Sequence, residues 1–219
     1  FWYSILTCNV EFRTTLEMKN NYKVIRQAIT KELADFIYSY FLMKRKVARK
    51  MYDERYISQS NYDYGVWNDE QIPETYSHYA DIAMETLLQN LQPKMEEETG
   101  LKLTPTYSYA RIYKKGDILK RHKDRYSCEV STTLNLGGDD WPIYLEPSGE
   151  EGKEGIKVDM QPGDMLVYKG CDVEHWREEF TGENCGQVFL HYNDASDPKA
   201  EENKYDKRPF LGLPSWFKS

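Results

Sequence analysis

Residues 104–136 read TPTYSYARIYKKGDILKRHKDRYSCEVSTTLNL, and this stretch decides the fold. β-branched and aromatic residues dominate 106–113 and 129–136, and Gly116 interrupts the sequence between them. Short runs of this kind, separated by turn residues, are typical of antiparallel strands. Similar runs follow at 141–145, 156–158, 165–168 and 187–192, again with Gly or Pro between them. Their number and spacing predict a sandwich or barrel, and a jelly roll fits them.

Two amphipathic stripes precede these strands. The first follows Thr30 and comprises Leu33, Phe36, Ile37, Tyr40 and Phe41; the second comprises Ala80, Ala83, Leu87, Leu88 and Leu91. Spacings of three and four residues predict helices with one apolar face. Pro93 is expected to open a new short helical turn, and Gly100 to close it. We therefore predict an α+β protein in which N-terminal helices support the outside of a jelly-roll or cupin-like barrel.

Composition narrows the class of protein. The net charge of -7 argues against a protein that binds the phosphate backbone of nucleic acids through its overall charge. Mean hydropathy is -0.78, and no apolar stretch approaches the roughly 18 residues that span a bilayer. The four cysteines, Cys8, Cys128, Cys171 and Cys185, form no CxxC pair and are too few for a disulfide scaffold. Residues 1–6 lack a signal-peptide pattern. A cytoplasmic location is expected.

The positions of the histidines indicate a metal-binding site. The chain has four: His78, His122, His175 and His191. His122 and Asp124 form a His-x-Asp triplet, and on a strand two such side chains point to the same side. A barrel can bring His175, on a later strand, beside them. Two histidines and one carboxylate leave three coordination positions open, which is the facial triad of non-haem Fe(II) oxygenases. The alternative is a surface ion pair between His122 and Asp124, with His175 packed in the core.

Several short motifs resemble one enzyme family. They are Tyr109-Ala-Arg-Ile-Tyr113-Lys-Lys-Gly116, Leu119-Lys-Arg-His122-Lys-Asp124, Pro162-Gly-Asp-Met-Leu-Val-Tyr168 and Glu174-His175. In order and spacing, across 101–192, they resemble the 2-oxoglutarate/Fe(II)-dependent dioxygenases of the prolyl 4-hydroxylase-like group. The resemblance implies a double-stranded β-helix, iron held by His122, Asp124 and His175, and O₂-dependent hydroxylation coupled to conversion of 2-oxoglutarate into succinate and CO₂. Ascorbate is allowed as a reductant.

The same resemblance assigns domain roles and reaction type. It implies one catalytic domain over 1–219, with helical support and a loop in 1–103, a jelly-roll core in 104–193 and a tail in 194–219. The tail is expected to pack back onto the domain. Halogenating relatives lack the carboxylate ligand, so the presence of Asp124 favours hydroxylation. His191 is expected to be a packed strand histidine, and His78 a structural one.

The residue that binds the far carboxylate of 2-oxoglutarate is left open. The family places Arg or Lys where this chain has Cys185. A buried carboxylate still needs a charged partner, and the candidates are Arg111, Arg177 and Lys169. Alternation puts Arg111 on the face of Tyr113, and Arg177 on the face of His175. Either arginine could instead form an ion pair with a glutamate at 174, 178 or 179.

Three further residues complete the expected cosubstrate site. Tyr113 matches a family tyrosine that hydrogen-bonds 2-oxoglutarate, Thr133 lies on a strand with other cosubstrate contacts, and Gln187 follows Cys185. The substrate is expected to be a peptide or small molecule, with prolyl side chains as the family-based candidate. A nucleic-acid demethylase with the same iron chemistry and a non-catalytic cupin-like metal-binding module are the alternatives. The aromatic segment 52–75 is either a surface loop or a lid that recognises substrate.

Overall fold

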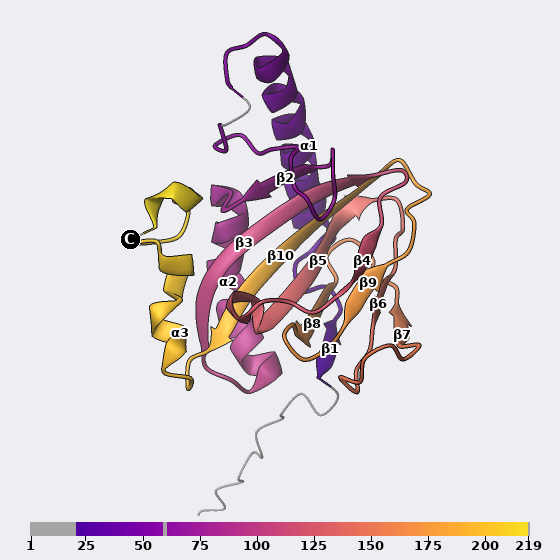
Figure 1. Cartoon of the computed structure of the whole chain (residues 1–219), viewed down its shortest axis with the longest axis vertical. Helices are drawn as coiled ribbons and strands as arrows, with labels where there is room; N and C mark the ends of the chain where they lie inside the picture. The colour runs from indigo at the N-terminus through magenta and orange to yellow at the C-terminus, as the bar shows by residue number, and fades with distance from the viewer. Residues whose placement is uncertain (1–20, 59–60, 219) are drawn as a thin grey trace, which may run out of the picture.

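Two antiparallel sheets build the molecule in this computed structural model, which describes residues 21–58 and 61–218 (Figure 1). Cys8 therefore lies outside the described residues. The larger sheet has the order β1 (Tyr22–Ile25), β8 (Met165–Lys169), β5 (Val130–Gly138), β10 (Asn184–Asp194), β3 (Leu103–Lys114) and β2 (Tyr76–Tyr79). The smaller sheet has the order β4 (Leu119–His122), β9 (His175–Arg177), β6 (Ile143–Leu145) and β7 (Ile156–Val158).

Two long helices cover the outer face of the larger sheet. Helix α1 (Lys31–Asp53) begins where the Thr30 side chain accepts a hydrogen bond from the Leu33 amide, and α2 (Ile82–Thr99) begins at an Asp81 cap. Their buried residues, among them Phe41, Leu88 and Met95, share one apolar core with Ile112 and Val188 of the sheet. These helices and sheets confirm the predicted α+β architecture with helical support.

Pro93 does not open a new helix, contrary to the expectation. Helix α2 continues through it and ends at Gly100, whose φ of 74° suits a left-handed cap. Leu88, Leu91 and Met95 on either side of Pro93 are all buried in the same core. This shared burial outweighs the lost backbone hydrogen bond, because tertiary packing commonly overrides local propensity.

The N-terminal part also contributes strands that the sequence did not reveal. β1 pairs with β8, and β2 pairs with β3, so each forms an outer strand of the larger sheet. Both have only four residues, too few for alternation to be distinguished from chance. β4 also has four residues, and β9, which carries both His175 and Arg177, has three.

The C-terminal tail packs back onto the domain, as expected. It contains α3 (Lys199–Glu202) and two short 3-10 turns, Lys204–Lys207 and Ser215–Phe217. The aromatic side chains of the tail are exposed, with Phe210 at 60% and Trp216 at 65%. The anchor is the buried Arg208, whose guanidinium lies 2.7 Å from a Glu85 carboxylate oxygen of α2. None of the helices in the described residues has the length and apolar character to cross a membrane.

Alternation along β3 separates the core from the site. Ala110 and Ile112 point to the helices and join the main core. Tyr109 and Arg111 point the other way, into the space between the two sheets, where both line a cavity. The inner face of the larger sheet and the smaller sheet therefore enclose the candidate site.

Candidate metal centre

Three donor side chains converge at the open end of the smaller sheet. His122 ends β4 and His175 begins β9, and the two are direct cross-strand partners. Asp124 Oδ1 lies 3.7 Å from His122 Nε2 and 3.5 Å from His175 Nε2. The three ligand atoms, one from each residue, all lie within 4.8 Å of one another. Two imidazole nitrogens and a carboxylate oxygen at this spacing suit a divalent transition metal with open coordination positions.

Asp124 reaches the centre by a route that differs from the predicted one. β4 ends at His122, so strand alternation does not align the two side chains. Instead, the Asp124 amide donates to Gly170 O at 2.8 Å, and Ser131 Oγ donates to Asp124 Oδ2 at 2.8 Å. A Cβ at Gly170 would lie 2.2 Å from Cys128 O and 2.6 Å from Asp124 Oδ2. Only glycine therefore allows this close approach.

Hydrogen bonds fix the two imidazole rings for metal binding. His122 Nδ1 lies 2.7 Å from Lys120 O, and His175 Nδ1 lies 3.2 Å from Val173 O. A carbonyl partner requires hydrogen on Nδ1, which leaves the Nε2 lone pairs directed at Asp124. Burial, and next the proximity of His175, lowers the pKa of His122. Burial would raise the pKa of Asp124, but its interaction with the neighbouring His175 lowers it, as does the hydrogen bond from Ser131. Both shifts favour the forms that bind metal.

Arg111 belongs to a second network beside the centre. Its guanidinium lies 2.5 Å from Asp69 Oδ2 and 2.7 Å from Gln71 Oε1, and Gln71 Nε2 lies 3.1 Å from His122 Nε2. Burial would raise the pKa of Asp69, but the charge of Arg111 lowers it. Arg111 is thus neutralised by a loop residue rather than by the glutamates considered above. Asp69 and Gln71 carried no sequence signal beyond their position in the aromatic segment 52–75.

Arg177 has no such carboxylate. It is fully buried, and it donates to two neutral oxygens, Trp141 O and Thr133 Oγ1, the latter at 3.4 Å. Its Nε has no hydrogen-bond partner, and no acidic side chain in 21–58 or 61–218 forms an ion pair with it. Burial lowers the pKa of Arg177. A buried cation without a counter-ion is costly unless a ligand neutralises it.

The other expected cosubstrate residues surround Arg177. Thr133 Oγ1 donates to Gln187 Oε1 at 2.9 Å, and Gln187 Nε2 lies 3.2 Å from Cys185 Sγ. Cys185 is the cross-strand partner of Tyr113, whose ring packs 4.7 Å from Trp141 between ring centroids. The structure therefore brings Tyr113, Thr133, Arg177 and Gln187 together, and assigns Arg111 to the Asp69 network. Lys169, the remaining candidate, ends β8, and like Tyr113, Thr133, Arg177 and Gln187 it does not line the cavity above the three donors, whereas Arg111 does.

A cavity of about 490 Å³ opens above the three donors. Its wall includes the three donors, the Arg111 network and the aromatic side chains Tyr107, Tyr109, Tyr168 and Phe189. His191 also borders it as a buried strand residue, as expected, with Nδ1 3.0 Å from Ser131 Oγ. Burial lowers the pKa of His191 to about 4. His78 is likewise buried, and its Nδ1 lies 3.3 Å from Asp81.

Comparison with known proteins identifies the fold. No protein-family model matches the chain, and no curated protein sequence matches it. Among solved structures, a prolyl-4-hydroxylase from Pseudomonas putida aligns at 15% identity over 81% of this chain and 95% of that chain, with a TM-score of 0.53. A Trichoplax adhaerens prolyl hydroxylase, in complex with a hypoxia inducible factor peptide, aligns at 14% over 82% and 86%, with a TM-score of 0.54.

A third similar structure is HygX from Streptomyces hygroscopicus, with nickel and 2-oxoglutarate bound. It aligns at 12% identity over 80% of this chain and 84% of that chain, with a TM-score of 0.55. At these identities the similarity defines the fold. The chain has the double-stranded β-helix of the 2-oxoglutarate/Fe(II) oxygenases, with prolyl hydroxylases among its structural neighbours, so the predicted fold is confirmed.

Proposed function

We propose that the chain is an Fe(II)- and 2-oxoglutarate-dependent oxygenase that hydroxylates a peptidyl or small-molecule substrate. The observation that carries the proposal is the combination of two features on one short strand. His175 of β9 belongs to the three-donor centre, and Arg177 of the same strand is a buried cation without a carboxylate partner. A metal site alone would fit many proteins, whereas a metal site beside an unneutralised arginine fits an anionic cosubstrate.

His122, Asp124 and His175 would hold the metal. When bound, Fe(II) supplies the activation of O₂ that protein side chains cannot perform. The chain's own contribution is to hold each ligand in its binding form. The Lys120 and Val173 carbonyls fix the two rings, and Ser131 fixes the carboxylate. Such supporting contacts typically change metal affinity by about 10–100-fold.

Arg177 would bind the far carboxylate of 2-oxoglutarate. Its guanidinium fork is suited to a carboxylate, and Thr133 Oγ1, which accepts a hydrogen bond from Arg177 Nη2 at 3.4 Å, helps to orient the fork. Arg177 would thus replace the basic residue that the family places at position 185. Arg111 is the weaker candidate because Asp69 already neutralises it. Tyr113 would orient the cosubstrate, since its hydroxyl lies 3.3 Å from Arg111 Nη1 and its ring packs beside Arg177's neighbour Trp141.

Aromatic side chains would keep water from the reacting groups. Tyr168 packs against the ring of His175 with centroids 4.7 Å apart, and Phe189 and Leu119 line the cavity near it. Displacing water strengthens the interactions between ligand charges and fixed protein groups. The donor set includes a carboxylate, which favours hydroxylation, and prolyl side chains are the first substrates to test.

The deciding experiment is anaerobic addition of Fe(II) and 2-oxoglutarate to the purified protein. We expect a weak visible charge-transfer band that requires both components, and succinate release on admission of O₂. Arg177→Met should remove the band at 2-oxoglutarate concentrations that saturate the unmodified protein. Metal binding without any such band would contradict the proposal and favour the cupin-like metal-binding module. The nucleic-acid demethylase alternative has no specific support in the site.

A further inference from the structure

The outer edge of β2 has free backbone groups beside the site. β2 is the last strand of the larger sheet, and its outer edge forms a single antiparallel bridge, between Ser77 and Val66. Both bonds of this bridge are made, at 2.9 Å and 2.8 Å. In an antiparallel strand every second residue directs its N–H and C=O to the same edge. The backbone of Tyr79 therefore points outward as Ser77 does, and no backbone group in the described chain pairs with it.

A tight turn keeps this edge open. The amide of Gly65 donates to Tyr62 O at 3.2 Å, and Gly65 has φ of +89°. A Cβ at Gly65 would lie 2.6 Å from the Tyr76 ring, so glycine is needed both for the conformation and for the close approach. The turn takes the chain away from β2 immediately before the bridge. The position opposite Tyr79 is left without a partner strand.

A second cavity, of about 300 Å³, lies along this edge. It is lined by three consecutive residues of β2, Ser77, His78 and Tyr79. Because successive side chains of a strand point to opposite faces, a cavity that touches all three lies along the edge rather than on one face. Pro214 and Lys218 from the C-terminal tail also line it.

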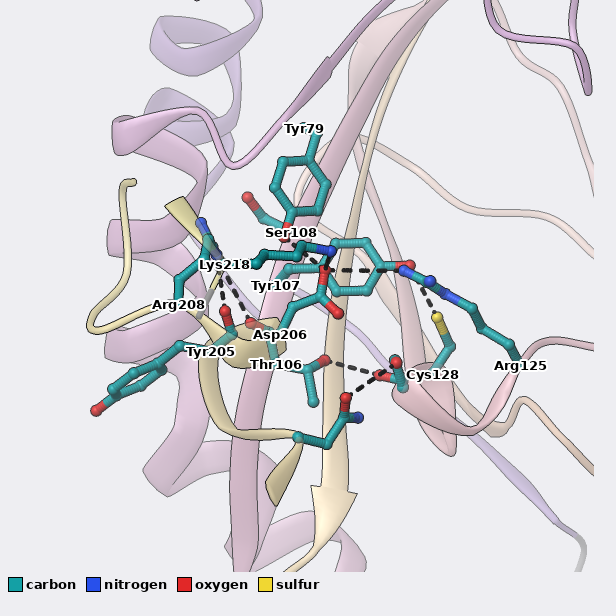
Figure 2. Close-up of polar contacts among 12 residues, drawn as sticks. Tyr79, Thr106, Tyr107, Ser108, Arg125, Cys128, Tyr205, Asp206, Arg208 and Lys218 are labelled. Atoms are coloured by element: carbon teal, nitrogen blue, oxygen red, sulfur yellow. Dashed lines mark hydrogen bonds and ion pairs between the residues drawn. The ribbon is translucent and has the colours of Figure 1, made fainter. Parts of the chain in front are cut away.

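The tail is fixed in place as the opposite wall. Asp206 accepts hydrogen bonds of 2.6 Å from both Tyr79 Oη and Lys218 Nζ, and Figure 2 shows these three side chains together. Arg208 joins the same segment to Glu85. The second cavity meets the metal cavity, because Asp69, Tyr109 and Arg125 line both.

We propose that this edge binds an extended polypeptide as an added antiparallel strand, with the residue to be oxidised reaching the metal cavity past Tyr109. The inference rests on the proposed function and assigns its substrate class. Tyr109 is the cross-strand partner of Tyr79 on β3. Tyr109 also lines both cavities, so the target residue lies beyond the strand-paired segment, where the peptide passes Tyr109.

Main-chain recognition distinguishes a peptide from other occupants. The free groups are one N–H and one C=O on a strand edge, which match the backbone of a peptide. A nucleic acid would instead need a track of unpaired cations. The two cations of this cavity, Arg125 and Lys218, both face Asp206, at 3.9 Å and 2.6 Å.

Random-sequence decapeptides with blocked ends are the probe. They are incubated with the protein, Fe(II), 2-oxoglutarate and O₂, and peptides that gain one oxygen atom are identified by mass. Each hit is then resynthesised with a single N-methyl group at each backbone position in turn. We expect N-methylation at one backbone position, outside the oxidised residue and at the same spacing from it in every hit, to weaken turnover about 10-fold or more, since one backbone hydrogen bond is lost. Uniform tolerance of N-methylation would overturn the proposal.

Two variants test the same bond from the protein side. Tyr79→Pro removes the outward N–H from an edge strand, where proline is tolerated, and Tyr79→Ala removes the same side chain but keeps the N–H. We expect the proline variant to bind hit peptides about 10-fold more weakly than the alanine variant, with folding checked by circular dichroism. Equal binding overturns the proposal. A charge-transfer band without oxidation of any peptide overturns it while leaving the proposed function intact; absence of the band instead contradicts that function.

Discussion

Two buried arginines, in two regions of the molecule, differ in what neutralises them. Arg208 in the C-terminal tail faces Glu85 across a buried ion pair and also bonds the carbonyls of Leu213 and Thr106. Arg177 is also buried, but within the described part of the chain it donates only to neutral oxygens, and its Nε has no partner there. The folded chain itself neutralises Arg208, through the carboxylate of Glu85. The charge of Arg177 would be neutralised by the proposed cosubstrate, and this is the difference that we expect between a structural arginine and one that serves a binding site.

The largest expected effect comes from breaking the centre beside Arg177. His122→Ala or Asp124→Ala removes one of three donors, and we expect succinate release to fall below detection. The melting temperature of the metal-free protein should stay within a few degrees of the parent, since neither side chain is part of the apolar core. Full turnover in either variant would rule out these residues as ligands.

The next largest effect is expected on stability, when the buried ion pair between Glu85 and Arg208 is broken. Glu85→Ala leaves Arg208 buried without its carboxylate, and we expect the free energy of unfolding to fall by about 3–5 kcal/mol. Asp35→Ala is the matched control, because Asp35 forms an exposed pair with Lys31 and such pairs contribute about 1 kcal/mol or less. Urea unfolding measures both. Equal losses would remove the contrast between the two kinds of pair.

Substitution of Arg177 should have the opposite effect on stability. Arg177→Met removes a buried cation without a counter-ion, so stability should be unchanged or should rise. We expect the 2-oxoglutarate concentration for half-maximal turnover to rise about 100-fold or more, through loss of charge-assisted hydrogen bonds. Arg111→Met is the comparison and should affect 2-oxoglutarate much less. The reverse ranking would make Arg111 the carboxylate partner.

A smaller effect concerns the buried histidine near the centre. The pKa of His191 in the folded chain is about 4, against an ordinary value of about 6.5. Below about pH 6.5 the unfolded chain takes a proton that the folded chain refuses, so stability falls until about pH 4. The contribution is on the order of 3 kcal/mol. His191→Asn should flatten this dependence, measured by urea unfolding with chelator present; an unchanged slope would contradict it.

The sequence alone predicted those site residues that a short motif makes recognisable. His122, Asp124 and His175 were identified by type and order, and the barrel by its punctuated strands. The predicted route by which Asp124 reaches the centre was wrong, because strand β4 ends at His122, two residues before Asp124. Asp69 and Gln71 were missed, because their role depends on a contact with Arg111, which is remote in sequence.

The sequence alone could not decide whether Arg111 or Arg177 binds the far carboxylate. Both alternate correctly with a neighbouring site residue, so the strand pattern cannot separate them. What separates them is whether a distant carboxylate is already present, and only the folded arrangement shows that. The free edge at Tyr79 was invisible for a related reason, since four residues and one bridge define it.

Strand β9 carries His175 and Arg177 two residues apart, so under the proposed function it would fix the distance between the metal and the cation that binds the far carboxylate. Two residues of extended chain span about 7 Å, and neither end can shift without moving the other. A diacid that is held at both ends is thereby measured by length. We expect diacids one carbon shorter or longer than 2-oxoglutarate to satisfy one end at a time, so that the backbone of the strand itself selects the cosubstrate.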